Sequence, residues 1–132
     1  MHSDGACEPT VVEQLLDRAR REASDWGVMF TNYDVLAAFN LPKLMDRVGF
    51  WDETFEWYRS DCDFYYRVGL SGLAKVETGL PVRHRASSTI NSDPRELARV
   101  NSHGEWQKVH YIHKWGGEQG RERFVVPYDI GT

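Results

Sequence analysis

The segment "WYRSDCDFYYR", residues 57–67, places two aspartates, Asp61 and Asp63, within a run of aromatic side chains. One interpretation is a helix start, with Ser60 as the cap and Asp63 at the third helical position, where carboxylates meet unpaired N–H groups. The other interpretation is catalytic, because a carboxylate that is held firmly and partly shielded from water by aromatic rings can accept a proton. Phe64 and Val68 give a helix that begins near residue 60 an apolar side, and Gly72 can end it.

Helical and strand patterns alternate on either side of this segment. The expected helices cover about 10–24, 42–49, 94–100 and 105–115, and the expected strands cover 26–33 and two short stretches around Thr78 and Gly79. In the first helix, Thr10 and Glu13 form a capping-box pattern. The alternation predicts an α/β or α+β fold with a small mixed sheet flanked by helices.

Composition narrows the class of protein. A length of 132 residues suits a single domain spanning 1–132. The net charge of -4 argues against a nucleic-acid binder that works through bulk charge. No apolar run reaches the roughly 20 residues of a membrane span, and the N-terminus lacks the pattern of a signal peptide. Cys7 and Cys62 form no CxxC pair, so we expect a reducing, cytoplasmic location, with peripheral membrane association as an alternative.

Several short motifs each allow a structural or a functional interpretation. The "HSD" triplet at residues 2–4 can hold a divalent metal or be a frayed terminus. His84 is more typical of a structural histidine than of a ligand, and His110 and His113 lack further ligands at zinc spacing. The "HKWGG" segment, residues 113–117, is either a helix C-terminus or a loop that presents a cation and a flat ring.

The order of these motifs carries more information than each one alone. The segments "VGFWDETFEWYRSDCDFYYRVGLSG", "HRASSTI", "YIHKWGG" and "ERFVVPY" follow one another along the chain. This series resembles the second half of family-2 glycosyltransferases with the GT-A fold, over roughly residues 26–128. The family pattern has a "G-x-x-D-E-x-F" segment, an "E-D-x-D" helix start, a His-containing loop and, in some bacterial members, "K-W-G-G".

The resemblance implies an inverting transfer of a sugar from a nucleotide-sugar donor to an acceptor hydroxyl. Asp61 matches the general base, and Asp63 matches the second acidic position, which supports the helix start and the acceptor site. Three aromatic residues, Trp51, Trp57 and Tyr58, are then candidates to stack on the acceptor sugar.

The donor side is implied by four other positions. His84 matches a histidine that reaches the metal or the donor diphosphate, and Lys114 and Trp115 match a loop that packs over the donor. Asp4 matches the metal carboxylate, and the implied cofactor is a divalent Mn or Mg ion. The chain departs from the family at His2, which stands where the first metal aspartate would be.

Two further features separate the chain from a complete GT-A enzyme. Ser60 replaces the usual glutamate beside the base, and no glycine-rich nucleotide-binding element is present. We therefore expect either a homodimer or a missing N-terminal half as partner, and poor transfer or none by the chain alone. Two other hypotheses stay open. One is a non-catalytic binding or oligomerisation module derived from a glycosyltransferase, and the other is a small metal-binding protein that uses His2, Asp4, Cys7 and the other histidines.

Overall fold

The computed structural model describes residues 5–32, 34–56, 58–84, 93–129 and 131. In chain order the elements are β1 (Gly5–Ala6), α1 (Pro9–Arg21), β2 (Trp26–Phe30), β3 (Ala37–Phe39), α2 (Leu41–Arg47), α3 (Ser60–Leu70), β4 (Ala74–Glu77), β5 (Arg83–His84) and α5 (Pro94–Trp115). The expected mixed α/β class with a small sheet flanked by helices is confirmed.

A three-stranded mixed sheet lies at the centre, in the order β3-β2-β4. Strand β2 pairs antiparallel with β3 and parallel with β4, so that Met29 faces Ala38 on one side and Val76 on the other. The run Trp26–Phe30 is almost entirely apolar because both faces of this central strand are covered. The predicted strand at 26–33 is therefore present, but it ends at Phe30.

The two short strands expected around Gly79 exist, but they do not form a hairpin. Strand β4 joins the central sheet, whereas β5 pairs antiparallel with β1 in a separate two-stranded sheet. Thr78 explains the separation, since its N–H and its hydroxyl both bond to the carbonyl of Phe30. The chain at Gly79 is thus tied to the end of β2, and Asn32 holds the residues that follow through bonds to Leu80 and Val82.

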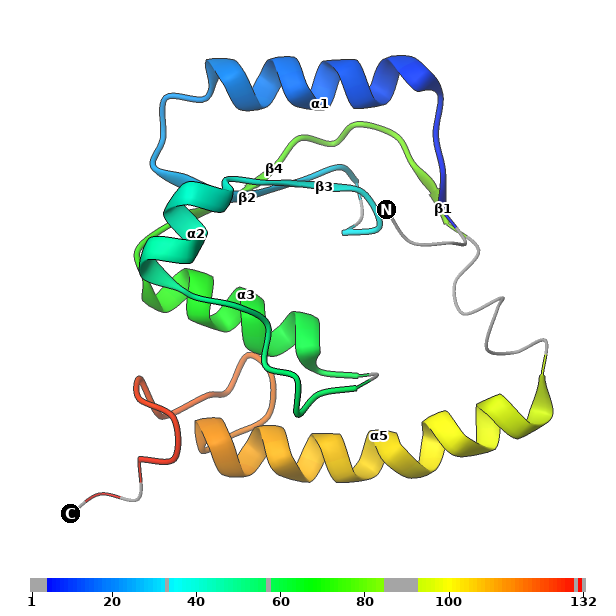
Figure 1. Ribbon diagram of the computed structural model, residues 1–132, viewed down its shortest axis with the longest axis vertical. Helices are drawn as coiled ribbons and strands as arrows, with labels where there is room; N and C mark the ends of the chain where they lie inside the picture. Colours follow the sequence, from blue (N-terminus) through cyan, green and yellow to red (C-terminus); the bar gives the residue numbers. More distant parts are fainter. Residues whose placement is uncertain (1–4, 33, 57, 85–92, 130, 132) are drawn as a thin grey trace.

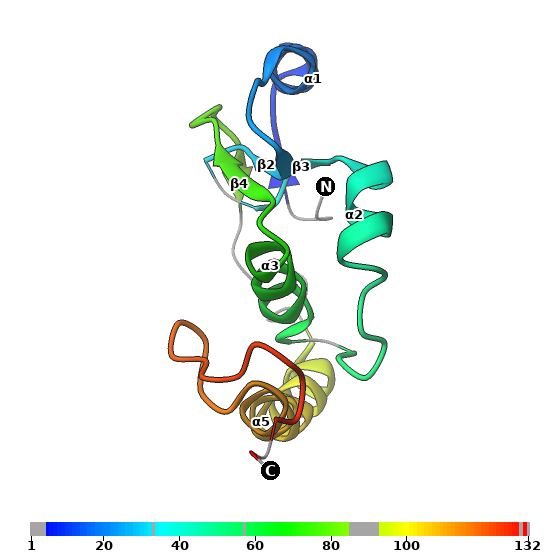
Figure 2. The ribbon, with the colours of Figure 1, turned by 90° about the vertical axis from the view of Figure 1, so that its left-hand side faces the viewer.

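The helices form layers around the sheet (Figures 1 and 2). Helix α1 covers one face of the sheet, α3 covers the other, and α5 packs beneath α3. The core between the sheet, α2 and α3 consists of Val28, Leu44, Phe64, Val68 and Leu73. A second cluster, Phe55, Tyr111 and Trp115, joins α5 to the loop before α3. Helix α3 is therefore held from two sides, which positions its first turn.

Two helix boundaries differ from the expectation. Helix α1 begins at Pro9 with Glu8 as N-cap and no side-chain cap bond, because proline at the first position fixes φ and needs no N–H partner. The capping box of Thr10 and Glu13 was therefore wrong. The helices expected at 94–100 and 105–115 are one continuous helix, α5. Gly104 continues the helix, and its missing side chain lets the Tyr58 ring approach, 3.2 Å from where a Cβ would lie.

Within the described residues, no helix combines the length and the apolar character that crossing a bilayer requires.

Candidate functional site

The first turn of α3 points its two aspartates in different directions. The helix begins at Ser60, and its N-cap is Arg59 in the left-handed region at φ 70°, with no side-chain cap bond. The expectation that Ser60 caps the helix and Asp63 completes a capping box was therefore wrong. Asp63 turns into the protein, and Asp61 turns toward the surface.

Asp63 lies at the centre of a buried polar cluster. Its carboxylate is 0% exposed and accepts a hydrogen bond from Trp115 Nε1 at 2.8 Å and from Arg67 Nε at 2.9 Å. Lys114 Nζ lies 2.6 Å from Asp63 Oδ1 and 2.6 Å from Asp52 Oδ2. We call Asp52, Asp63, Arg67, Lys114 and Trp115 the Asp63 network. Its two carboxylates and two cations balance in charge, as buried ions require.

The network joins three separate segments of the chain. Arg67 also donates to the carbonyls of Val48 and Phe50, which ties the loop after α2 to α3. At Asp52, burial opposes ionisation, but the hydrogen bonds from Lys114 and Thr54 outweigh it and hold the pKa of this carboxyl well below its usual range. The loop, α3 and the C-terminus of α5 are therefore cross-linked by charge-assisted bonds at the point where α3 begins.

Lys114 and Trp115 lie on a helix and not in a loop. Both are buried in the last turn of α5, which ends at Gly116 in the left-handed region at φ 72°. The following segment folds back over this end, and Arg123 N and Phe124 N both bond to the Trp115 carbonyl. The helix C-terminus was therefore the correct alternative for the structure of "HKWGG". The role of Lys114 and Trp115 in donor binding stays a prediction.

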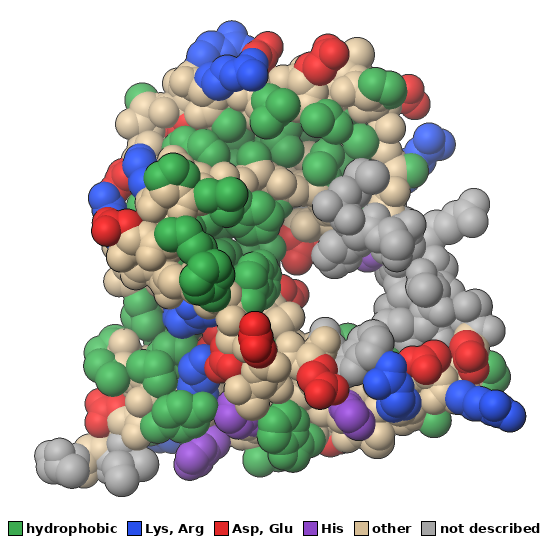
Figure 3. Space-filling view, viewed as in Figure 1, with side chains coloured by type: hydrophobic (Ala, Val, Ile, Leu, Met, Phe, Trp, Pro, Cys, Tyr) green, Lys and Arg blue, Asp and Glu red, His purple; other side chains and the backbone are tan. Residues whose placement is uncertain are grey.

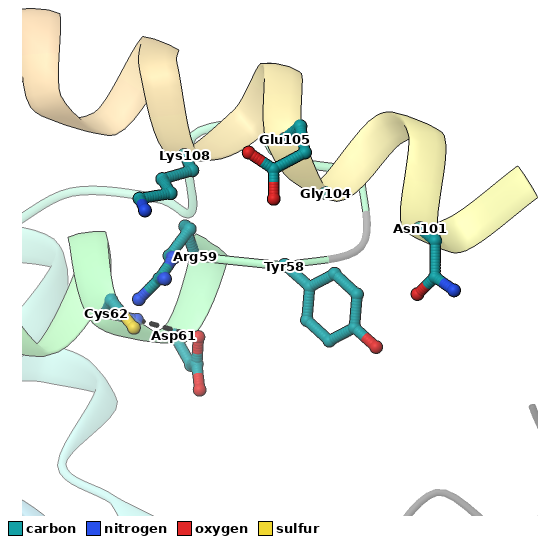
Figure 4. Close-up of a pocket in the computed structure, with 8 residues that line it drawn as sticks. All are labelled: Tyr58, Arg59, Asp61, Cys62, Asn101, Gly104, Glu105 and Lys108. Atoms are coloured by element: carbon teal, nitrogen blue, oxygen red, sulfur yellow. Dashed lines mark hydrogen bonds between the residues drawn. The ribbon is translucent and has the colours of Figure 1, made fainter. Parts of the chain in front are cut away.

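Asp61 opens into a pocket of about 360 Å³ between α3 and α5. The lining residues, which define the Asp61 pocket, are Tyr58, Arg59, Asp61, Cys62, Asn101, Gly104, Glu105 and Lys108. Figure 4 shows the Asp61 carboxylate and the Tyr58 ring pointing to the same open side, with Arg59 and Lys108 nearer to α5. Asp61 Oδ1 accepts the N–H of Cys62 at 2.8 Å, which orients the carboxylate.

The surroundings of Asp61 combine an aromatic face with both signs of charge. Tyr58 is 41% exposed, and its backbone N–H donates to Gln107 Oε1 at 2.5 Å, which anchors this loop to α5. Burial, together with the nearby Asp61 charge, raises the pKa of the Cys62 thiol to about 11. The pocket therefore offers two carboxylates, of which that of Asp61 is oriented, together with a phenol ring and two cations, but no thiolate nucleophile at neutral pH.

The other predicted site residues that the structure describes do not line this pocket, apart from Tyr58. Trp51 is 42% exposed and stacks on Phe64 at 4.2 Å, so its ring covers the core. His84 belongs to β5, whose sheet with β1 is separate from the sheet that leads into α3. Trp57 and Asp4 lie outside the described residues.

The implied metal ion has no ligand set in the part of the chain that the structure describes. Among those residues, no three His, Cys, Asp or Glu side chains lie close enough to hold a metal ion. Asp4, one of the two predicted ligands beside His84, falls outside them. The described residues do not supply a metal site by themselves, so no chemical step is derived through one, and the Mn or Mg cofactor stays a prediction.

Two sets of residues at the site were not predicted from the sequence. The α5 residues of the Asp61 pocket, Asn101, Gly104, Glu105 and Lys108, follow the i, i+3, i+4, i+7 spacing of one helical face. That signal was hidden because 94–100 and 105–115 were interpreted as two helices. Asp52 stands in the family-like "G-x-x-D-E-x-F" segment, but no role had been assigned to it.

Comparison with known proteins yields no relative: no family model, no curated protein and no solved structure matches this chain.

Proposed function

We propose that this chain carries the acceptor-binding, proton-accepting part of a glycosyl-transfer site, with Asp61 as the general base. In such a transfer the acceptor oxygen forms a bond to the anomeric carbon, the bond from that carbon to the diphosphate breaks, and the acceptor proton passes to Asp61. One observation carries the proposal: of two aspartates in one helical turn, Asp63 is buried in a network while Asp61 faces a pocket.

The geometry supports this role in two ways. A general base must lie within hydrogen-bond reach of the proton that it abstracts, and Asp61 is open to the pocket where an acceptor would sit. The Asp63 network holds the start of α3 to α5 and to the preceding loop. A rigidly supported first turn keeps the Asp61 carboxylate in place, which is what a catalytic group needs.

The remaining lining residues suit an acceptor sugar and an anionic leaving group. The half-exposed ring of Tyr58 can pack against the apolar face of a sugar. Arg59 and Lys108 are the cations among the described lining residues. Lys108 pairs with Glu118 at 3.0 Å, whereas Arg59 bonds to the neutral amide of Gln119, so Arg59 is the cation placed to attract a diphosphate. Lys114 meets two carboxylates, and its charge is therefore already balanced within the protein.

The proposal is tested by measuring transfer and binding together. The chain is assayed with a panel of nucleotide sugars and simple glycoside acceptors, with Mg²⁺ or Mn²⁺ present. Where transfer occurs, Asp61→Asn should lower kcat at least about 100-fold, because a general base typically contributes that much. Asp46→Asn, a matched change at an exposed position of α2, should leave kcat unchanged.

Binding decides the case if the chain alone does not turn over. Glycoside acceptors should then shift the backbone NMR signals of Tyr58, Asn101 and Gly104 in a saturable way. The proposal fails if no acceptor shifts these signals, or if Asp61→Asn keeps full activity in a transferring preparation.

A second candidate function, a non-catalytic oligomerisation module, is favoured by one surface feature. Large apolar side chains are exposed on α2 and the segments beside it, where Figure 3 shows apolar surface over the α2 side of the molecule. They are Phe39, Leu41, Met45, Phe50 and Trp51, with Phe50 81% exposed. Light scattering should then give a dimer whose mass does not change with ligand, and Phe50→Ser should shift it toward monomer. A monomer of the unmodified chain removes this candidate.

A further inference from the structure

The loop before α3 leaves a second pocket on its other side. It measures about 400 Å³, a volume typical of small-ligand sites, and it is separate from the Asp61 pocket. The lining residues used below are Glu53, Thr54, Glu56, Ser102, His103 and Trp106, and we call this site the Trp106 pocket. Its position is set by Gln107, which lines the pocket and binds the backbone of Tyr58 where the loop crosses α5.

Trp106 is the most unusual feature of this pocket. Its side chain is 55% exposed, although the indole is the largest aromatic ring among the amino acids and is usually largely buried. The indole is held in place, since it stacks on His110 at 5.3 Å with an interplanar angle of 10°, and His110 in turn contacts Phe55. Histidine and apolar side chains lie together along the α5 edge at the bottom of Figure 3. A fixed and exposed indole beside a hollow is suited to packing against a flat ligand face.

Two carboxylates, a histidine and hydroxyl groups complete the pocket. Glu53 and Glu56 supply carboxylates, and His103 Nδ1 lies 3.5 Å from Glu56 Oε2, which restrains that side chain. The Ser102 hydroxyl donates to the Arg99 carbonyl at 2.8 Å, so its oxygen can accept a bond from a ligand. These groups favour hydroxyls and ammonium groups and repel carboxylates and phosphates.

We infer that the Trp106 pocket binds a saccharide ring, with an amino sugar preferred to a neutral sugar and a uronic acid disfavoured. The apolar C–H face of the ring packs on the Trp106 indole, the hydroxyls bond to Ser102 and Thr54, and the ammonium group meets Glu53 and Glu56. Binding here does not require glycosyl transfer, so the inference stands or falls independently of the function proposed for Asp61.

Titrations with three probes test the order of affinity. Glucosamine, glucose and glucuronate are added to the isotope-labelled chain at about pH 7, where the amine is mostly protonated. Glucosamine should bind with a Kd on the order of 1 mM, as expected for the few contacts of one sugar ring. Glucose should bind up to about fivefold more weakly, the typical size of one exposed charge pair, and glucuronate more weakly still. The shifted signals should belong to Thr54, Ser102 and Trp106.

Variants separate this site from the Asp61 pocket. Trp106→Ala should weaken glucosamine binding at least about tenfold, whereas Val109→Ala, an exposed apolar change on the same helix, should not alter it. Trp106→Tyr keeps an aromatic face and should retain most of the affinity, which guards against a folding defect in the alanine variant. The double change Glu53→Gln and Glu56→Gln should abolish the preference for glucosamine over glucose. Glu105→Gln, which lies in the Asp61 pocket, and Asp61→Asn should preserve that preference.

Three results would overturn the inference. The first is shifts confined to Tyr58, Asn101 and Gly104, which would place the sugar in the Asp61 pocket. The second is equal affinity for all three probes. The third is the lack of saturable shifts up to about 50 mM sugar, which is well above the Kd expected for the Trp106 pocket.

Discussion

Asp61 and Asp63 are two residues apart, yet they belong to different parts of the molecule. Asp63 is completely buried, with Trp115, Arg67 and Lys114 around its carboxylate. Asp61 lines an open pocket. Its carboxylate is oriented by a hydrogen bond from the backbone N–H of the next residue, Cys62. One aspartate joins segments of the chain, and the other faces an open pocket.

The difference follows from helix geometry. Residues two apart on an α-helix point about 200° apart around its axis, so they cannot share an environment when one side of the helix is packed. Helix α3 packs against the sheet and α5, and this packing selects Asp63 for burial. The comparison teaches that an acidic pair at a helix start can divide into one structural and one accessible carboxylate.

The largest expected effect is on stability at Asp63. Asp63→Ala leaves Lys114, Arg67 and the Trp115 N–H without their shared partner, and breaking a buried ion pair in this way costs about 3–5 kcal/mol. Asp61→Ala removes a partly exposed carboxylate and should cost about 0.5 kcal/mol or less. Urea unfolding followed by tryptophan fluorescence measures both. Similar losses for the two variants would contradict the division described above.

A smaller effect concerns Asp52 and depends on pH. Its pKa is lowered below the ordinary value of 3.8, so its contribution is fully present above that value and is lost as pH falls through the lower folded pKa. Asp52→Asn should therefore lower the free energy of unfolding by about 1–3 kcal/mol at neutral pH. The difference in free energy of unfolding between the unmodified chain and the variant should narrow below about pH 4.

Acid titrations of the unfolding midpoint for both proteins provide the measurement. Glu13→Gln, an exposed change on α1, serves as the control and should track the unmodified chain at every pH. A gap that widens on acidification would show that Asp52 does not ionise as the Lys114 contact requires.

The smallest effect is a change in thiol reactivity beside Asp61. Burial and then the Asp61 charge raise the pKa of Cys62 from 9.0 to about 11, which lowers its thiolate fraction about a hundredfold at neutral pH. In a Cys7→Ser background, Cys62 should react slowly with a disulfide reagent at about pH 8. Adding Asp61→Asn should raise the rate a few-fold, because one of the two leading causes is removed. An unchanged rate would mean that the two side chains are not coupled.

Much of the fold could be predicted from local patterns, but several pairings could not. The apolar stripe of α1, the strand from Trp26 and the glycines that follow α2, α3 and α5 were visible because they depend on neighbours in the sequence. The pairing of β4 with β2 and of β5 with β1 was not, since it depends on contacts between residues far apart.

The candidate site divides in the same way. The segment at 57–67 was predicted to hold an important acidic pair, and its helix forms where the pattern indicated. The α5 side of the Asp61 pocket and the role of Asp52 were missed, because both come from helix α5 crossing the loop before α3. Nothing in the spacing of Asp61 and Asp63 says which of them a second helix will cover.

The sequence by itself determined where α1, α2, α3 and the start of β2 arise, because hydrophobic periodicity, glycine and proline act over a few residues. Only the tertiary structure decided which carboxylate became part of the core. Burying Asp63 is favourable only with Lys114, Arg67 and the Trp115 N–H already in position, since an unpaired buried charge is costly. Lys114 and Trp115 come from more than fifty residues further along the chain, and the folded chain alone brings them to α3.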